Sequence, residues 1–357
     1  MSARGAEPGT QPESVRGAEP GTQPRCAREA ETETDRIMTV LGPIEPDQLG
    51  ACQAHEHLFV KEGPATRTFP DLLLDDYGKT LQELTTYFAA GGRSLVDAQP
   101  VGSGRMAGLQ ERVSRESGVH VVAATGFHRP LFYDESHWIH HASMHKLVGL
   151  FTEELETGLY LDGESAWPVE RGTARAGIIK TAAGPDGISG RWGTLFDAAA
   201  ETAGRTAAPV LIHTEEGHGA MEILRFFLDR GVAAHQLIFC HLDRVAGNSA
   251  YMAEVAAAGA WLELDTIGRF KYHDDREEAG TIGKLISLGH GAHMLLGLDV
   301  TRARMRAYGG TIGLAYLHDR FLPLLRQSGI LEADLRRMMV ENPAKALRRH
   351  TTDTRNK

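Results

Sequence analysis

The sequence predicts an α/β fold, a single (β/α)8 barrel preceded by a tail without stable structure. Eight short apolar runs alternate with longer amphipathic stretches, which is the pattern of repeated βα units and a parallel sheet. Eight such units with insertions fit the length of the chain after its tail. An open, doubly wound sheet is the alternative, but no GxGxxG motif follows the first apolar run.

The eight apolar runs are predicted to be strands because they are short and most are rich in Val, Ile or Leu. They cover residues 52–58, 94–99, 120–125, 176–181, 210–214, 237–241, 261–265 and 294–299. The fourth run, AGIIK, has the composition of a strand buried on both faces, yet it delivers an amine, Lys180, into the interior. That residue requires a chemical explanation.

The amphipathic stretches between the runs are predicted to be helices. Four of them are YGKTLQELTTYFAAG, TLFDAAAETAGRT, AMEILRFFLDRG and AYMAEVAAAG. Three of these four end at a glycine, which commonly follows the last turn of a helix.

The first 36 residues differ from the rest of the chain, because RGAEPGTQP occurs at residues 4–12 and again at 16–24. A segment of this composition has too little apolar surface to offset the entropy lost on ordering. We therefore expect a disordered low-complexity tail at 1–36, the barrel at 37–350 and a short C-terminal tail at 351–357. A binding role for the repeat, and a natural start at Met38, are the alternatives.

Composition narrows the class of protein. The formal net charge of -9 argues against a general surface for nucleic acid or anionic membrane. The three cysteines, Cys26, Cys52 and Cys240, are scattered and odd in number, which suggests a reducing compartment. No apolar window approaches the length of a membrane span, and no apolar signal segment is visible. We expect a cytoplasmic protein that acts on a small molecule.

Polar residues gather at the C-terminal ends of the predicted strands, where barrels of this kind carry their functional groups. They are His55 and His57 in AHEHL, Lys180 in IIKTA, His213 in LIHTE, His241 in FCHLD and Asp299 in GLDVT. Residues i and i+2 of a strand share a face, so His55 and His57 can meet one metal ion while Glu56 points away. Each histidine alone is weak evidence, but the combination predicts a metal site.

This constellation resembles the phosphotriesterase family of the amidohydrolase superfamily, from about Thr39 to ENPAKAL near the C-terminus. The resemblance implies two divalent ions, usually zinc, with manganese or cobalt as substitutes. It implies that His55, His57 and Asp299 hold the more buried ion and that His213 and His241 hold the more exposed one. Lys180 would bridge the two ions as a carbamate, and a hydroxide would form the second bridge. Relatives are often homodimers, so a homodimer is possible here.

Physical reasoning agrees with the role that the resemblance gives to Lys180. Burial disfavours the charged ammonium, and a neutral amine can add to carbon dioxide to give an anion that two cations stabilise. Two bound metal ions favour hydrolysis, because they activate water and polarise a carbonyl or phosphoryl oxygen. Asp299 is then expected to take the proton of the attacking group and to pass it to the leaving group.

The loops after the last two strands bear on the substrate. Lys271 and Arg302 follow the seventh and eighth strands, near where many barrels bind phosphate, and a lysine with a forked arginine suits a phosphate monoester. These segments resemble the branch of the family that hydrolyses phosphorylated sugar lactones. Phe127 and His128 stand where acyl-homoserine lactonases tend to carry a tyrosine. His128 is a candidate contact for the lactone, and Tyr272 and Arg269 are weaker candidates.

We therefore expect a metal-dependent hydrolase that opens a sugar lactone, for example a phosphorylated aldono-1,4-lactone. A promiscuous organophosphate or acyl-homoserine lactone hydrolase is the alternative, and a non-catalytic barrel is a remote one. His137, His141 and His145 recur every four residues and could line one helical face as a second metal site. No acidic partner or cysteine accompanies them, so we favour a non-metal role for these three histidines.

Overall fold

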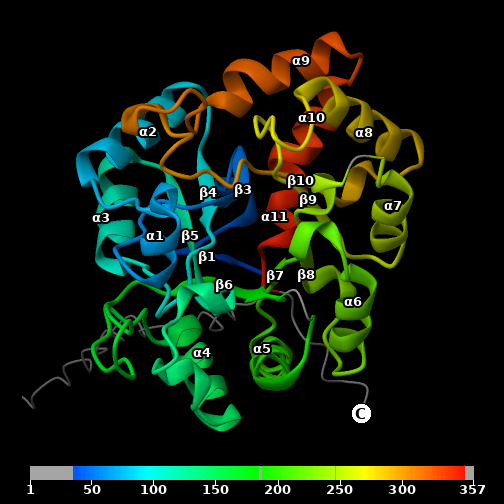
Figure 1. Ribbon diagram of the computed structural model, residues 1–357. Coiled ribbons are helices and arrows are strands. Elements are labelled where there is room, and N and C mark those ends of the chain that lie inside the picture. The colour runs from blue at the N-terminus through cyan, green and yellow to red at the C-terminus, as the bar shows by residue number, and fades with distance from the viewer. Residues whose placement is uncertain (1–34, 185–186, 246, 350–357) are drawn as a thin grey trace, which may run out of the picture. The chain divides into compact units, whose positions relative to one another are not determined.

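The computed structural model describes residues 35–184, 187–245 and 247–349, and the duplicated RGAEPGTQP segment lies outside these ranges. Eight parallel strands follow one another in chain order from β3 to β10 in a single sheet, which curls into a barrel surrounded by helices (Figure 1). The strands are β3 Cys52–Glu56, β4 Ser94–Asp97, β5 His120–Gly126, β6 Ala176–Ala182, β7 Val210–His213, β8 Leu237–Cys240, β9 Trp261–Leu264 and β10 Met294–Leu296. All eight predicted strands are confirmed, with ends shifted by a few residues.

The first and last strands of this sheet close the barrel. The backbone N–H of Asp299, just after β10, donates to the carbonyl oxygen of His55 in β3 at 3.0 Å. The closure brings the first and the last predicted metal ligands of the chain together, although they are more than 200 residues apart in sequence. The fold therefore places the predicted ligands His55 and Asp299 side by side where the first and last strands meet.

The helices that alternate with the strands pack outside the barrel (Figure 1). The α-helices are α1 Pro64–Thr68, α2 Tyr77–Ala89, α3 Ala107–Ser117, α4 Met144–Glu156, α5 Gly190–Thr206, α6 Ala220–Leu228, α7 Ser249–Ala257, α8 Asp275–Ser287, α9 Leu322–Gln327, α10 Glu332–Arg336 and α11 Asn342–Ala346. The four helical stretches singled out in the sequence correspond to α2, α5, α6 and α7, so those predictions are confirmed.

Successive side chains of a strand point to opposite sides, and this alternation produces two apolar clusters. One side of each strand faces the barrel interior, where Val96, Val122, Ile178, Leu211 and Ile238 pack together. The other side packs against the surrounding helices in a larger cluster. Burial on both sides explains why the strands are near-continuous apolar runs in the sequence.

A short antiparallel hairpin before the barrel was not predicted. Its strands are β1 Ile37–Thr39 and β2 Gly42–Ile44, and β1 contacts β5 and β6. The Met38 carbonyl comes so close to Gly177 of β6 that a Cβ atom there would lie 2.3 Å from the oxygen. Glycine in the RAGIIK segment therefore lets the hairpin pack onto the barrel.

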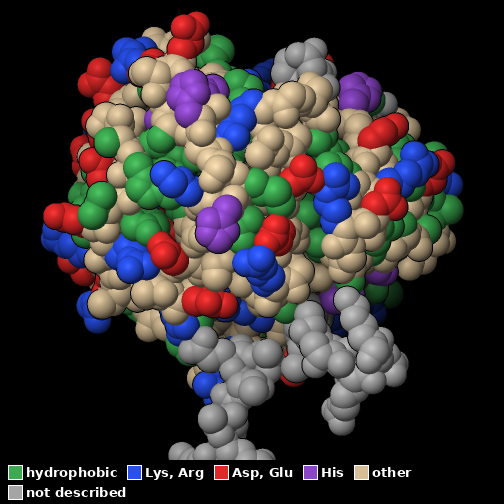
Figure 2. All heavy atoms as spheres, turned by 90° about the horizontal axis from the view of Figure 1, so that it is seen from below, with side chains coloured by type: hydrophobic (Ala, Val, Ile, Leu, Met, Phe, Trp, Pro, Cys, Tyr) green, Lys and Arg blue, Asp and Glu red, His purple; other side chains and the backbone are tan. Residues whose placement is uncertain are grey.

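The surface of the described residues is mixed in character. Seen from below in Figure 2, basic and acidic side chains are interspersed over the face that is drawn. Among the helices that the structure describes, none is long and apolar enough to cross a membrane. Cys52 and Cys240 are buried free thiols.

Candidate metal centre and active-site pocket

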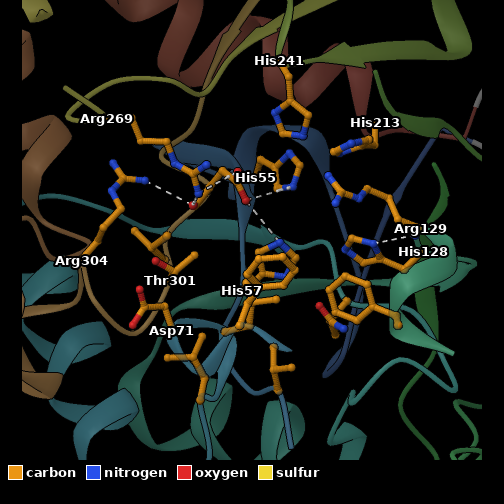
Figure 3. Close-up of a pocket in the computed structure, with 18 of the residues that line it drawn as sticks. His55, His57, Asp71, His128, Arg129, His213, His241, Arg269, Thr301 and Arg304 are labelled. Carbon is orange, nitrogen blue, oxygen red and sulfur yellow. Dashed lines mark hydrogen bonds and ion pairs between the residues drawn. The ribbon is translucent and has the colours of Figure 1, made fainter. Parts of the chain in front are cut away.

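A cavity of about 720 Å³ opens at the C-terminal ends of the strands. Ten of the eleven residues predicted to bind metal or substrate line it: His55, His57, His128, Lys180, His213, His241, Arg269, Lys271, Tyr272 and Asp299. Figure 3 shows the imidazole rings of His55, His57, His213 and His241 converging on one region of this cavity. The exception is Arg302, which does not line it.

The six residues predicted to hold metal lie within a few ångströms of one another. The ring centroids of His213 and His241 are 4.5 Å apart, and those of His55 and His57 are 5.5 Å apart. Asp299 Oδ1 lies 3.4 Å from His57 Nε2 and 3.8 Å from His55 Nε2. The groups His55, His57 and Asp299 present one potential ligand atom each within 4.8 Å of one another. This spacing suits a shared metal ion.

Lys180 is buried in the centre of this group of imidazoles. Its Nζ atom lies 3.3 Å from His55 Nε2, and among the residues that the structure describes no carboxylate lies within ion-pair distance of it. A buried ammonium without an anionic partner is costly. The surroundings therefore favour an uncharged or chemically modified lysine.

The backbone is distorted where it presents these side chains. The pairing of β3 with β4 shifts register between Gln53 and Glu56, which turns the following residues toward the cavity. His241 and Asp299 have left-handed backbone conformations, with φ of 69° and 47°. Because such conformations are unfavourable for residues other than glycine, surrounding contacts must hold them in place.

Two buried carboxylates from β9 and its end support the histidines and were not predicted. His55 Nδ1 donates to Glu263 Oε2 at 2.9 Å, and His241 Nδ1 donates to Asp265 Oδ1 at 2.7 Å. With Nδ1 protonated, the lone pair of each Nε2 is free to bind metal. Glu263 and Asp265 stand two residues apart in WLELD, so they share one face of the strand. That spacing was the signal available in the sequence.

Burial determines the protonation of the second pair of histidines. Desolvation lowers the pKa of His213 to about 3 and lowers the pKa of His241 well below its usual value. Both rings are therefore neutral near pH 7, the form that binds metal. His55 differs, because its burial is outweighed by Glu263 and Asp265, which raise its pKa to about 9. Metal binding must displace a proton from this ring.

Two arginines hold the carboxylate of Asp299. Arg244 donates to its Oδ2 atom at 2.8 Å, and Arg269 Nη2, which donates to the Asp299 carbonyl, lies 2.9 Å from the same Oδ2. Burial alone would raise the pKa of Asp299, but Arg269 and neighbouring histidines lower it well below its usual value. Asp299 is therefore ionised, and Oδ1 is the oxygen left for a metal ion or a proton. Arg244 is a contact that the sequence did not suggest.

The residues predicted to bind substrate are divided between the cavity and the surface. Lys271 and Tyr272 line the cavity, with Lys271 Nζ 4.6 Å from the centroid of the Tyr272 ring. His128 also lines it, and its ring packs on Phe132 with centroids 3.7 Å apart. Arg269, a weaker candidate, also lines the cavity, on the side opposite His128 (Figure 3).

The expectation that Arg302 faces the same cavity as Lys271 is wrong for this conformation. The Arg302 backbone N–H donates to the Asp71 carbonyl at 2.8 Å. Its guanidinium donates to the Leu73 carbonyl and lies 3.5 Å from Asp75. These contacts direct the side chain to the outside of the loop. Arg304 lines the cavity instead, donating to backbone carbonyls of Leu298 and Ile267.

The alternative metal site at His137, His141 and His145 is not supported, because the three do not share a helix. His137 precedes a short 3-10 helix, Trp138–His140, whereas His145 lies in α4. His137 Nδ1 accepts from the Ile139 N–H and its Nε2 lies 3.1 Å from the Gly163 carbonyl. Both ring nitrogens of His137 therefore have protein partners.

Comparisons with known proteins agree with this geometry. The sequence model described as "Phosphotriesterase family" matches residues 35–347. A protein of Mycoplasmopsis synoviae named phospho-furanose lactonase is 31% identical over 319 residues, which are 87% of this chain and 90% of that protein.

Two solved structures are similar along most of their length. The crystal structure of an amidohydrolase from Mycoplasma synoviae has a TM-score of 0.85 and 30% identity, and covers 89% of this chain and 93% of its own. The crystal structure of a lactonase from Listeria monocytogenes has a TM-score of 0.81 and 26% identity, and covers 88% and 99%.

Proposed function

The chain belongs to the phosphotriesterase family, and we propose that this hydrolase is a binuclear metal-dependent lactonase whose substrate is a sugar lactone carrying a phosphate, such as an aldono-1,4-lactone phosphate. The observation that carries the proposal is the convergence of four histidines, Lys180 and Asp299 in one cavity at the strand ends. The names of the similar proteins support the choice of a lactone.

The donor set fits a pair of divalent ions, for which we propose zinc. His55, His57 and Asp299 would hold one ion, and His213 and His241 the other. Glu263 and Asp265 already hold two of these rings through Nδ1, so Nε2 is the nitrogen that would bind an ion. Lys180 would join the two ions as a carbamate, which accounts for a buried amine with no carboxylate partner. Bound in this way, the ions would supply an activated water and polarise the lactone carbonyl.

Asp299 is the residue that we assign to proton movement. Its Oδ2 atom is held by Arg244 and Arg269, so Oδ1 is the atom that would accept the proton of the attacking water. Passing that proton to the ring oxygen completes lactone opening, because the leaving alkoxide needs a proton. The two arginines orient Asp299 for this role.

Lys271 is the proposed first contact of the phosphate, since it is a basic residue that lines the same cavity as the histidines. Arg302 can join it only by leaving Asp75 and the Leu73 carbonyl. His128 and Tyr272 are proposed to contact the lactone ring or its hydroxyls. Binding the remote phosphate would orient the carbonyl for attack.

The test compares phosphorylated and unphosphorylated forms of the same aldonolactones by kcat/KM, on protein supplied with zinc and bicarbonate. The phosphate should raise kcat/KM, and Lys271→Met should remove most of that advantage while leaving the free lactone unaffected. Equal kcat/KM values for the two forms would refute the phosphate proposal. Failure to hydrolyse any lactone would refute the lactonase proposal.

A specific observation favours a second candidate function, the hydrolysis of lactones or organophosphates with apolar groups. Phe69 and Phe270 line the cavity while their side chains are 50% and 60% exposed. An apolar rim of this kind suits an acyl chain or an aromatic leaving group. Turnover of a long-chain lactone that falls in Phe270→Ala and is unchanged in Lys271→Met would support this function.

A further inference from the structure

A second cluster of metal-binding side chains lies outside the active-site cavity. Asp243 belongs to a short 3-10 helix, Leu242–Arg244, directly after β8. His273 lies in the loop between β9 and α8, and Glu278 lies in the first turns of α8. One potential ligand atom from each lies within 4.8 Å of the others, and all three residues are buried. None of the three lines the active-site cavity.

The hydrogen bonds within this cluster leave two carboxylate oxygens unsatisfied. Asp243 Oδ2 accepts from the Thr266 N–H at 2.7 Å. His273 Nε2 lies 3.1 Å from Glu278 Oε2 and 2.8 Å from the Asp243 carbonyl oxygen, so an ion bound through Nε2 would replace these two contacts. Among the residues that the structure describes, Asp243 Oδ1 and Glu278 Oε1 are buried and have no hydrogen-bond partner. A buried carboxylate oxygen without a partner is costly.

The protein supplies little positive charge to balance these two carboxylates. Within the described ranges, no lysine or arginine lies within ion-pair distance of Asp243 or Glu278, and His273 is the neighbouring basic group. Lys284 lines the adjacent hollow but forms no ion pair with either carboxylate. A cation between two adjacent buried carboxylates would offset their mutual repulsion.

One imidazole and two carboxylates are a donor set that zinc and manganese accept. The distance of 3.1 Å between His273 Nε2 and Glu278 Oε2 is compatible with two ligands of one ion. A hollow of about 310 Å³ is lined by Asp243 and His273, though not by Glu278, and it gives two of the three residues access from solvent and room for water ligands. We propose that Asp243, His273 and Glu278 bind a further divalent ion, zinc or manganese, separate from the active site.

An ion at this position would stabilise the wall of the active site. It would connect α8 to the segment that directly follows His241. Asp243 already accepts from Thr266, the neighbour of Asp265, which holds the His241 ring. The ion would therefore restrain the backbone that supports one histidine of the active site, with no contact to the substrate.

The test measures zinc directly and does not depend on turnover. Crystals of the full chain loaded with zinc are measured on both sides of the zinc absorption edge, and metal content is determined in solution. The carboxylate variant is Glu278→Gln, and the matched control is Glu277→Gln, an exposed neighbour that borders the same hollow but does not belong to the cluster. We expect an anomalous peak among Asp243, His273 and Glu278, and one bound ion fewer per chain in Glu278→Gln than in the wild type or Glu277→Gln.

The absence of an anomalous peak at this position in zinc-loaded and manganese-loaded wild-type crystals would overturn the proposal. Equal metal content in Glu278→Gln and Glu277→Gln would also overturn it and would indicate that the carboxylates share a proton instead. If Glu278→Gln does not fold, the anomalous measurement on the wild type decides. If the wild type shows the anomalous peak but hydrolyses no lactone, only the proposed function is refuted.

Discussion

Replacement of Asp265 by Asn tests whether the buried carboxylates of β9 control metal binding. Asp265 Oδ1 accepts from His241 Nδ1 at 2.7 Å, and its Oδ2 lies 3.4 Å from His55 Nδ1. An amide can still accept one hydrogen bond, but it removes the negative charge that makes His241 a better ligand. His55 keeps its bond to Glu263, so the ion held by His213 and His241 should be the one affected.

The expected loss follows from the contacts that change. Losing one partner behind a ligating histidine typically weakens metal binding by about 10- to 100-fold, which corresponds to about 1.4–2.7 kcal/mol. Because the Asp265 side chain is fully buried and touches two of the rings, we expect the upper part of this range. Zinc affinity is measured by competition with a chelator, together with the number of ions retained after dialysis.

The control separates metal binding from stability. Glu83, in α2, is also buried, and its carboxylate accepts from Ala307 N and Leu314 N rather than from an imidazole. Glu83→Gln should lower the melting temperature without changing zinc affinity. Unchanged zinc affinity in Asp265→Asn, or an equal loss in both variants, would refute the reasoning.

Three further predictions concern other parts of the molecule. Lys180→Ala should lose both bound metal and activity, and added short carboxylates should restore part of each. Metal analysis and turnover measure the two effects. Full metal content in this variant without the additive would contradict the carbamate. Burial lowers the pKa of His137 from 6.5 to about 4, so the unfolded chain takes up the proton first and stability should fall as pH drops from 6.5 toward 4. Melting temperatures across this range should show a weaker pH dependence in His137→Gln, and an unchanged dependence would contradict the assignment. Finally, Lys271→Met should raise KM for a phosphorylated lactone more than Arg302→Met does, because only Lys271 lines the cavity; the reverse order would show that Arg302 moves inward.

The strands were predictable because each is buried on both sides, which favours short and mainly apolar runs. Their polar ends were predictable because a barrel gathers all C-terminal strand ends at one face. The carboxylates behind the histidines were harder to predict. WLELD shows two acids on one face of β9, but only the closed barrel shows that they lie opposite His55 and His241.

Arg302 shows a different limit of sequence reasoning. The position of a residue after a strand predicts the loop in which it lies. It does not predict the direction of a long side chain, because that direction depends on neighbours that are distant in sequence. Here Asp71, Leu73 and Asp75, from the segment before α2, hold Arg302 outside the cavity. Arg244 was missed for the same reason, because its contact with Asp299 spans 55 residues.

The charge of the cavity explains why the chemistry proposed for Lys180 matters for metal binding. The protein as a whole is acidic, with a formal charge of -9, yet the cavity is lined by Arg129, Arg244, Arg269, Lys271 and Arg304 against only Asp71 and Asp299 among its described acids. Such a lining attracts an anionic substrate, but it also repels divalent cations.

An ammonium at Lys180, 3.3 Å from His55 Nε2, would add to that repulsion at the point where the two proposed ions would bind. Conversion to a carbamate replaces a positive charge by a negative one at the same point and supplies two oxygen ligands. Metal loading and carbamate formation should therefore depend on each other: zinc binding should tighten with bicarbonate concentration, and the carbamate should be lost when zinc is removed.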